Sequence, residues 1–97
     1  MNIKQLQVHI DGLIERASQA RAESERLASD AVNYDANGIP TEAEANRKLS
    51  TQRLSDAVRL QEEAEDARRE LLSMQSEVDA LNARIFELQA KRDGMTG

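Results

Sequence analysis

The chain has 97 residues, of which 32% are charged and only 2% are aromatic, and its net charge is −5. A chain of this length forms one domain at most, and its richness in alanine, glutamate, arginine, glutamine and leucine is typical of long helices and coiled coils. The negative charge and the dispersed basic residues argue against nucleic-acid binding, which needs clustered lysine and arginine. The sequence predicts an all-α protein with too few bulky side chains for a compact globule.

The sequence also limits the compartment and the covalent chemistry. It has no cysteine, which excludes disulfides and thiolate metal sites. No apolar run approaches the ~20 residues of a membrane span, and the N-terminus lacks the apolar core of a signal peptide. We expect a cytoplasmic protein that does not bind membranes.

The first predicted helix covers residues 3–36 and has a regular heptad repeat. Apolar or small residues recur in steps that alternate between three and four, which is the pattern of a coiled-coil seam. With Ile3 as position a and Leu6 as position d, the seam consists of Ile3, Leu6, Ile10, Leu13, Ala17, Ala20, Ser24, Leu27, Ala31 and Tyr34.

Residues 37–41 are predicted to form a tight turn. Gly38 suits the left-handed conformation that ends a helix in a Schellman motif, and Pro40 prevents the helix from continuing. Thr41 and Glu44 have the spacing of a capping box for a following helix. Because the connection is so short, we expect the two helices to fold back as an antiparallel hairpin.

The second predicted helix covers residues 42–92 and is followed by a tail, 93–97, in which Gly94 can end the helix. Its heptad pattern is weak near the turn, where Ser50 and Arg53 fall on the seam. The regular part of the seam consists of Ala57, Leu60, Ala64, Ala67, Leu71, Met74, Val78, Leu81, Ile85 and Leu88.

Folding the chain about Gly38 places large seam residues of one helix opposite small ones of the other, which lets facing layers interdigitate. The predicted hairpin core pairs Ile3 with Met74, Leu6 with Leu71, Ile10 with Ala67, Leu13 with Ala64, Ala17 with Leu60, and Ala20 with Ala57.

The two predicted helices differ in length, at roughly 50 Å and roughly 77 Å for 1.5 Å per residue. Residues 76–92 therefore extend beyond the end of the first helix and retain an apolar stripe without a partner in the chain. A contiguous exposed apolar stripe indicates an interaction site. The predicted partner-binding residues are Val78, Leu81, Asn82, Ile85, Phe86, Leu88 and Gln89.

Two occupants fit this stripe. Val78 and Ile85 at a, with Leu81 and Leu88 at d, favour a two-stranded parallel coil with a second copy of the chain. A groove on a different protein is the alternative, in which the bulky Phe86 acts as an additional anchor.

The hairpin by itself buries little apolar surface, and small domains are marginally stable even when compact. Val58, Leu72 and Phe86 form a further stripe at alternate b positions. We therefore expect an oligomer, either a dimer of hairpins or a four-helix bundle, or a hairpin stabilised by a foreign partner.

The sequence contains no recognisable catalytic, cofactor or metal constellation. His9 is the only histidine and cannot form a zinc site alone. The acidic stretch 62–70 has Ala64 and Ala67 at its inward positions, so we expect its carboxylates to face solvent and not to form a metal site. There is no glycine-rich phosphate loop and no calcium loop. We expect no enzyme activity, no cofactor and no small-molecule substrate.

The sequence thus favours a small adaptor or inhibitor that binds a larger protein through its C-terminal helix, such as a phage or mobile-element protein that acts on a host machine. The alternative is a structural homo-oligomer, such as an assembly or scaffolding subunit, or a secretion-type chaperone. Nucleic-acid binding is the most distant hypothesis, and it would rest on Arg47, Lys48, Arg53 and Arg59.

Overall fold

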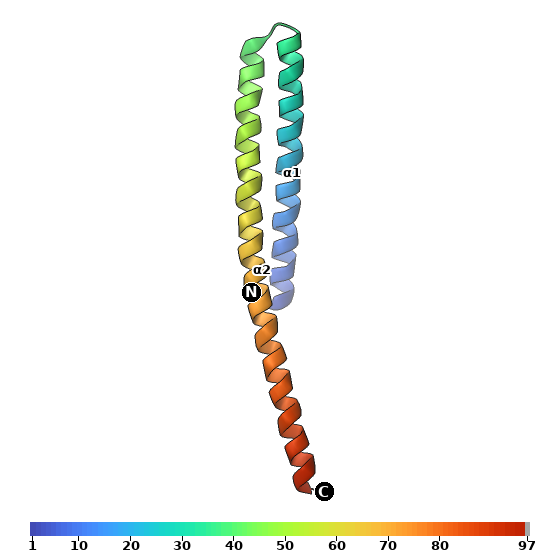
Figure 1. Ribbon diagram of the computed structural model, residues 1–97. Coiled ribbons are helices and arrows are strands. Elements are labelled where there is room, and N and C mark those ends of the chain that lie inside the picture. The colour runs from blue at the N-terminus through green and yellow to red at the C-terminus, as the bar shows by residue number, and fades with distance from the viewer. Residues whose placement is uncertain (97) are drawn as a thin grey trace.

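The computed structural model describes residues 1–96, which form two helices, α1 (Ile3–Ala36) and α2 (Pro40–Thr96). Figure 1 shows the helices side by side and antiparallel, with α2 continuing far beyond the N-terminus of α1. The molecule is very elongated, with extents of 88 × 16 × 13 Å. The predicted all-α hairpin with a longer second helix is confirmed.

The N-terminus of α1 is closed by a capping box. The backbone N–H of Gln5 donates to the side chain of Asn2 (2.8 Å), and the backbone N–H of Asn2 donates to the side chain of Gln5 (3.1 Å). These two bonds satisfy backbone donors that have no partner within the helix.

The turn has the predicted Schellman geometry. Gly38 has a φ of +73°, its N–H donates to the carbonyl of Asp35 (3.1 Å), and the N–H of Ile39 donates to the carbonyl of Tyr34 (2.8 Å). A salt bridge of 2.6 Å between Arg47 and Asp35 joins the two helices just beyond the turn. The turn therefore carries both backbone and side-chain restraints on the hairpin.

The helix α2 begins earlier than the sequence predicts. It starts at Pro40 rather than at residue 42, so the connection is shorter than 37–41, and Thr41 is already the second residue of the helix. The carbonyl of Ile39 accepts the first helical hydrogen bond, from Ala43 (3.2 Å). Proline fits the first helical position because its missing N–H is not needed there. The predicted capping role of Thr41 with Glu44 is therefore wrong.

The C-terminal end of α2 also differs from the prediction. The helix passes through Gly94 and continues to Thr96, where the sequence predicts a tail from residue 93. Glycine disfavours a helix by only about 1 kcal/mol, and this cost is too small to end α2 at Gly94. Residue 97 of the predicted tail lies outside the described part of the chain.

The core is a single seam between the helices. Leu13 and Ala17 of α1 pack with Leu60 and Ala64 of α2. A second cluster, nearer the open end, consists of Leu6, Ile10 and Ala67, against which the half-buried Leu71 and Met74 pack. Large side chains thus meet small ones across the seam. Of the twelve predicted core residues, eight are buried and four are half-buried, the latter being Ile3, Ala20, Leu71 and Met74.

Nearer the turn, small and polar side chains replace the large apolar ones. Ala31 and Ala43 are buried, and Ser24 and Ser50 form a reciprocal pair in which each hydroxyl donates to the other residue's backbone carbonyl (2.8 Å each). Such bonds require the two backbones to lie close together, which the small side chains permit.

Arg53 occupies a seam position beside this serine pair. Its guanidinium lies 3.4 Å from the carboxylate of Glu23 on α1 and 3.2 Å from that of Asp56 on α2. The charge of Glu23, with a contribution from Asp56, raises the pKa of Arg53. The arginine thus compensates two acidic side chains that would otherwise repel each other across the helix pair.

The glycines provide a matched test of the turn. Replacing Gly38 by alanine should destabilise the hairpin by about 1 kcal/mol, because its positive φ is unfavourable for a side chain although the space around it is open. Urea or thermal unfolding followed by circular dichroism measures the change.

Gly12→Ala is the control, since Gly12 lies inside α1 with nothing within 4 Å of an added Cβ. This change should stabilise the protein by roughly 0.5–1 kcal/mol, because alanine has the higher helix propensity. If Gly38→Ala and Gly12→Ala changed the stability in the same direction, the assigned role of the turn would be wrong.

Candidate functional site

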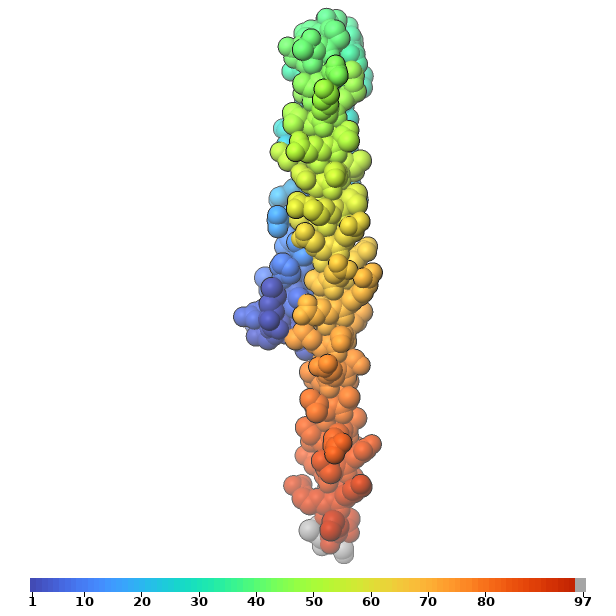
Figure 2. Space-filling model, turned by 90° about the vertical axis from the view of Figure 1, so that its left-hand side faces the viewer, coloured from blue at the N-terminus to red at the C-terminus, as the bar shows by residue number. Residues whose placement is uncertain are grey.

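The candidate site is the part of α2 that α1 does not cover, residues 76–92, here called the overhang. Every side chain from Ser76 to Met95 is exposed, whereas Leu71, Met74 and Gln75 just before it are half-buried. In Figure 2 the molecule narrows to the width of one helix at this point. The change coincides with the N-terminal end of α1.

The overhang has the same apolar heptad pattern as the buried seam, but its apolar side chains are exposed. Leu81 is 60% exposed and Leu88 54% exposed at the d position, where Leu6 and Leu13 of α1 are each 2% exposed. The seven predicted partner-binding residues all lie here and all are exposed: Val78, Leu81, Asn82, Ile85, Phe86, Leu88 and Gln89.

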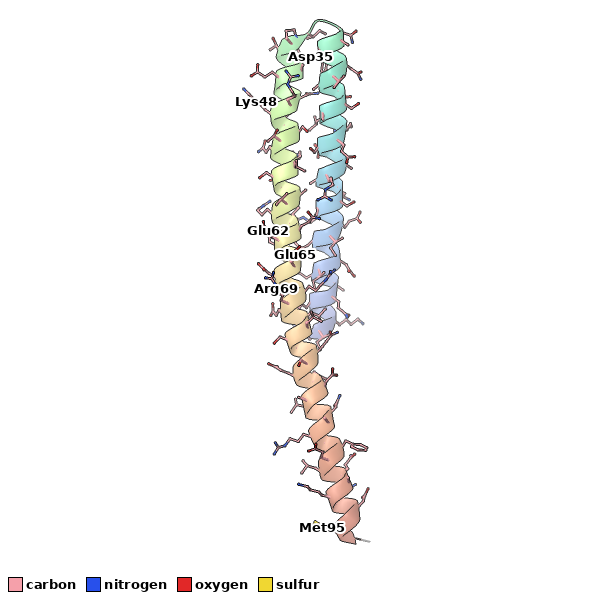
Figure 3. All side chains as sticks on the ribbon, in the orientation of Figure 1. Asp35, Lys48, Glu62, Glu65, Arg69 and Met95 are labelled. Atoms are coloured by element: carbon pink, nitrogen blue, oxygen red, sulfur yellow. The ribbon has the colours of Figure 1, made fainter. Side chains whose placement is uncertain are left out.

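These seven residues do not share one face. Val78, Leu81, Ile85 and Leu88 follow the three-four spacing and continue the hairpin seam along one stripe. Phe86, the most exposed of the five apolar members at 72%, follows Ile85 directly and is rotated by about 100° from it. Side chains project from all sides of the overhang, with no second helix beside it (Figure 3). Phe86 therefore lies off the stripe, in keeping with its b position in the heptad.

The flanks of the stripe differ in charge. One flank contains amides at heptad spacing, and the other contains one acidic and two basic side chains. The amide flank consists of Gln75, Asn82 and Gln89, and the charged flank of Glu77, Arg84 and Lys91. Residues at these positions face a partner helix across the edges of a two-helix seam.

The hollows at this surface are shallow. The depression on the overhang is lined by residues of α2 alone, which are Glu77, Ala80, Leu81, Ala83, Arg84 and Glu87. A depression on one helix can receive a side chain of a partner, but it does not enclose a small molecule as ligand pockets do. Within the described residues, no three His, Cys, Asp or Glu side chains are grouped to hold a metal ion, and His9 is exposed.

The basic residues considered for nucleic-acid binding are engaged with acidic partners. Arg47 pairs with Asp35 (2.6 Å), Lys48 with Glu44 (3.5 Å), and Arg59 with Asp56 (3.8 Å). Arg53 lies between Glu23 and Asp56, as described above. Asp35 and Lys48 lie on the two helices of the turn end in Figure 3. The four residues therefore belong to mixed-charge clusters and do not form a basic patch.

Across the residues described, neither helix has a stretch both long and apolar enough to cross a membrane. Comparisons of the chain with protein-family models, with curated proteins and with solved structures find no match. The function is therefore inferred from the overhang itself.

The contrast between the buried and exposed parts of the seam can be measured. Leu13→Ala should lower the free energy of unfolding by about 2–4 kcal/mol, because it removes a side chain that is 2% exposed and leaves a cavity. Leu88→Ala, the same change at an exposed seam position, should alter it by less than about 0.5 kcal/mol.

Urea unfolding at low protein concentration, where association does not contribute, measures both changes in the free energy of unfolding. A large loss of stability for Leu88→Ala under these conditions would mean that the overhang is covered within its own chain.

Proposed function

We propose that the chain is a non-catalytic protein–protein interaction module, a small adaptor or inhibitor whose overhang binds the surface of a larger protein. The observation that supports this proposal is the continuity of the seam: the heptads that α1 covers as far as Met74 continue through Leu88 without a cover. An apolar stripe of this kind gains free energy when a partner removes it from water.

Without the hairpin, the overhang would be only partly helical in water. A helix of this length is marginally stable in water unless one face packs on something. Because the hairpin holds residues 40–75 helical, the overhang begins from an existing helix and avoids the cost of nucleation. We infer that the hairpin is a coiled coil whose role is to present the overhang as a preformed helix, which lowers the entropic cost of binding.

The expected binding mode is a helix in a groove, or a helix paired with another helix. In both, side chains at the a and d positions act as the anchors, and the flanking polar residues set the orientation. Phe86 on its separate face then contacts the target only if the target wraps around the overhang.

A second candidate function is a structural homo-oligomer, which the flank charges of the overhang favour. Glu77 and Lys91 carry opposite charges at the two ends of the same flank, a pattern that can complement itself.

The double substitution Leu81→Asp with Ile85→Asp tests the assigned surface. The tagged full-length chain should capture a stoichiometric partner from the native host, and the double variant should lose at least about 90% of it, because each buried aspartate costs several kcal/mol at an apolar interface. Quantitative mass spectrometry of the captured protein is the measurement.

Val8→Asp with Val32→Asp is the matched control, since both valines are about as exposed as Leu81 but lie on α1 (66% and 67%). This control should retain full capture, and circular dichroism should show equal helicity for all three proteins. If the overhang variant retains the partner while the α1 variant loses it, the binding surface lies on α1.

A further inference from the structure

We propose that a second copy of the chain occupies the overhang, with its own overhang antiparallel and with Val78 of each copy facing Leu88 of the other. This inference rests on the second candidate function, the homo-oligomer, and adds the direction and register in which the two overhangs pair.

The antiparallel direction follows from continuity with the existing interface. The stripe of α2 already packs against an antiparallel helix, α1, up to Met74. A second α2 helix in the same direction as α1 continues that packing along the same stripe, starting near the N-terminus of α1. Four layers then form, in which Val78 faces Leu88 twice and Leu81 faces Ile85 twice. All eight side chains in these layers are apolar, and all are exposed in the single chain.

Neighbouring registers are less favourable. A shift of one heptad toward the hairpin places Leu88 of the second copy on Leu71, which α1 already half covers. A shift of one heptad in the other direction buries Arg92 against Leu81 and brings Arg84 next to Lys91, which have like charges. The proposed register avoids the burial of Arg92 against Leu81 and keeps Leu88 of the second copy off Leu71, and only the residues of the second copy from Lys91 on reach the level of α1.

The flanks support the same register. In it, Glu77 of each copy lies beside Lys91 of the other, which gives two complementary pairs. On the amide flank, Asn82 lies beside Asn82 of the second copy and Gln75 beside its Gln89, so no charge is opposed. The one unfavourable pair is Arg84 with Arg84 of the second copy, at the two-fold axis. A parallel pair suits the β-branched residues at a and the leucines at d, but it places Glu77 beside Asn82 and Arg84 beside Gln89, with no complementary charges.

The ends of the helices are compatible with this arrangement. Beyond Ala90, the second copy reaches the level of Met1, and the last turns of its α2 helix lie beside the N-terminus of α1. Asp93 of the second copy then approaches the first turn of α1, which contains Lys4 and no acidic side chain. A carboxylate is favourable at the positive end of a helix dipole.

Sedimentation of the purified full-length chain tests whether a second copy binds. Over a concentration series from about 1 to about 200 µM, we expect a reversible monomer–dimer equilibrium. Leu81→Asp should weaken the dimer at least about tenfold, and Phe86→Asp, which lies off the stripe, should not change it. Arg84→Gln should strengthen the dimer about two- to fivefold, because it removes the like-charge pair.

Cysteine pairs test the direction, and the chain has no cysteine of its own. A mixture of Val78→Cys and Leu88→Cys chains should form a mixed disulfide in a thiol-exchange buffer. Neither variant should form a disulfide with itself, since the two copies of Val78 are separated by about 15 Å along the axis. Phe86→Cys is the control and should remain reduced.

The outcomes separate the two proposals. A chain that stays monomeric at the highest concentration overturns the second copy as occupant, while loss of the host partner in the Leu81→Asp/Ile85→Asp variant would still support the interaction module. A Leu88→Cys disulfide with itself indicates a parallel pair and overturns the register, and so does an unchanged dimer in Arg84→Gln. A dimer that Leu81→Asp does not weaken places the interface elsewhere and overturns the inference.

Discussion

Two helices can bury only the stripes along which they touch, and this chain depends on one such contact. The seam between α1 and α2 contains all of the buried apolar side chains among the described residues. Because most of its members are alanines, the helices gain their burial by close approach and not by bulk. The length over which α2 can be covered is therefore fixed by the length of α1, and the uncovered remainder becomes the candidate site.

Close approach also explains why polar side chains are tolerated within the seam. The serine pair uses backbone carbonyls as acceptors, which is possible only where the chains lie near each other. Arg53 is too long for a close-packed layer, so it extends to the edge and reaches Glu23 and Asp56. Polar layers of this kind cost stability and favour one register over others. They lie in the half of the hairpin where apolar residues specify the register least.

The sequence predicted the features that depend on periodicity and on local backbone chemistry. The alternation of Leu13 with Ala64 and of Ala17 with Leu60 indicated the pairing, and Gly38 indicated the Schellman turn. The Asn2–Gln5 capping box also has a readable spacing, since an amide stands three residues after an asparagine, but it lies before the first seam residue and did not enter the heptad pattern. For the site, the sequence predicted which seven residues are uncovered.

Other features depended on geometry that a heptad pattern does not contain. Thr41 had the right neighbours for a cap, but Pro40 is equally suited to the first helical position, and the helix starts there. Gly94 is a weak stop signal, because a single glycine without a capping hydrogen bond does not end a long helix. The link from Arg53 to two acidic residues on different helices requires the distance between them.

The distribution of side-chain size along the hairpin has a consequence for how it forms. Contacts near the turn join residues close in sequence, but they are made by alanine and serine, such as Ala31, Ala43 and Ser24. The large side chains, Leu6 and Ile10, meet residues more than half the chain away. Closing that long loop costs entropy before the main gain in burial is obtained. The Schellman turn and the Arg47–Asp35 salt bridge offset part of this cost by holding the helices together at the start, so the hairpin is expected to close from the turn toward the open end.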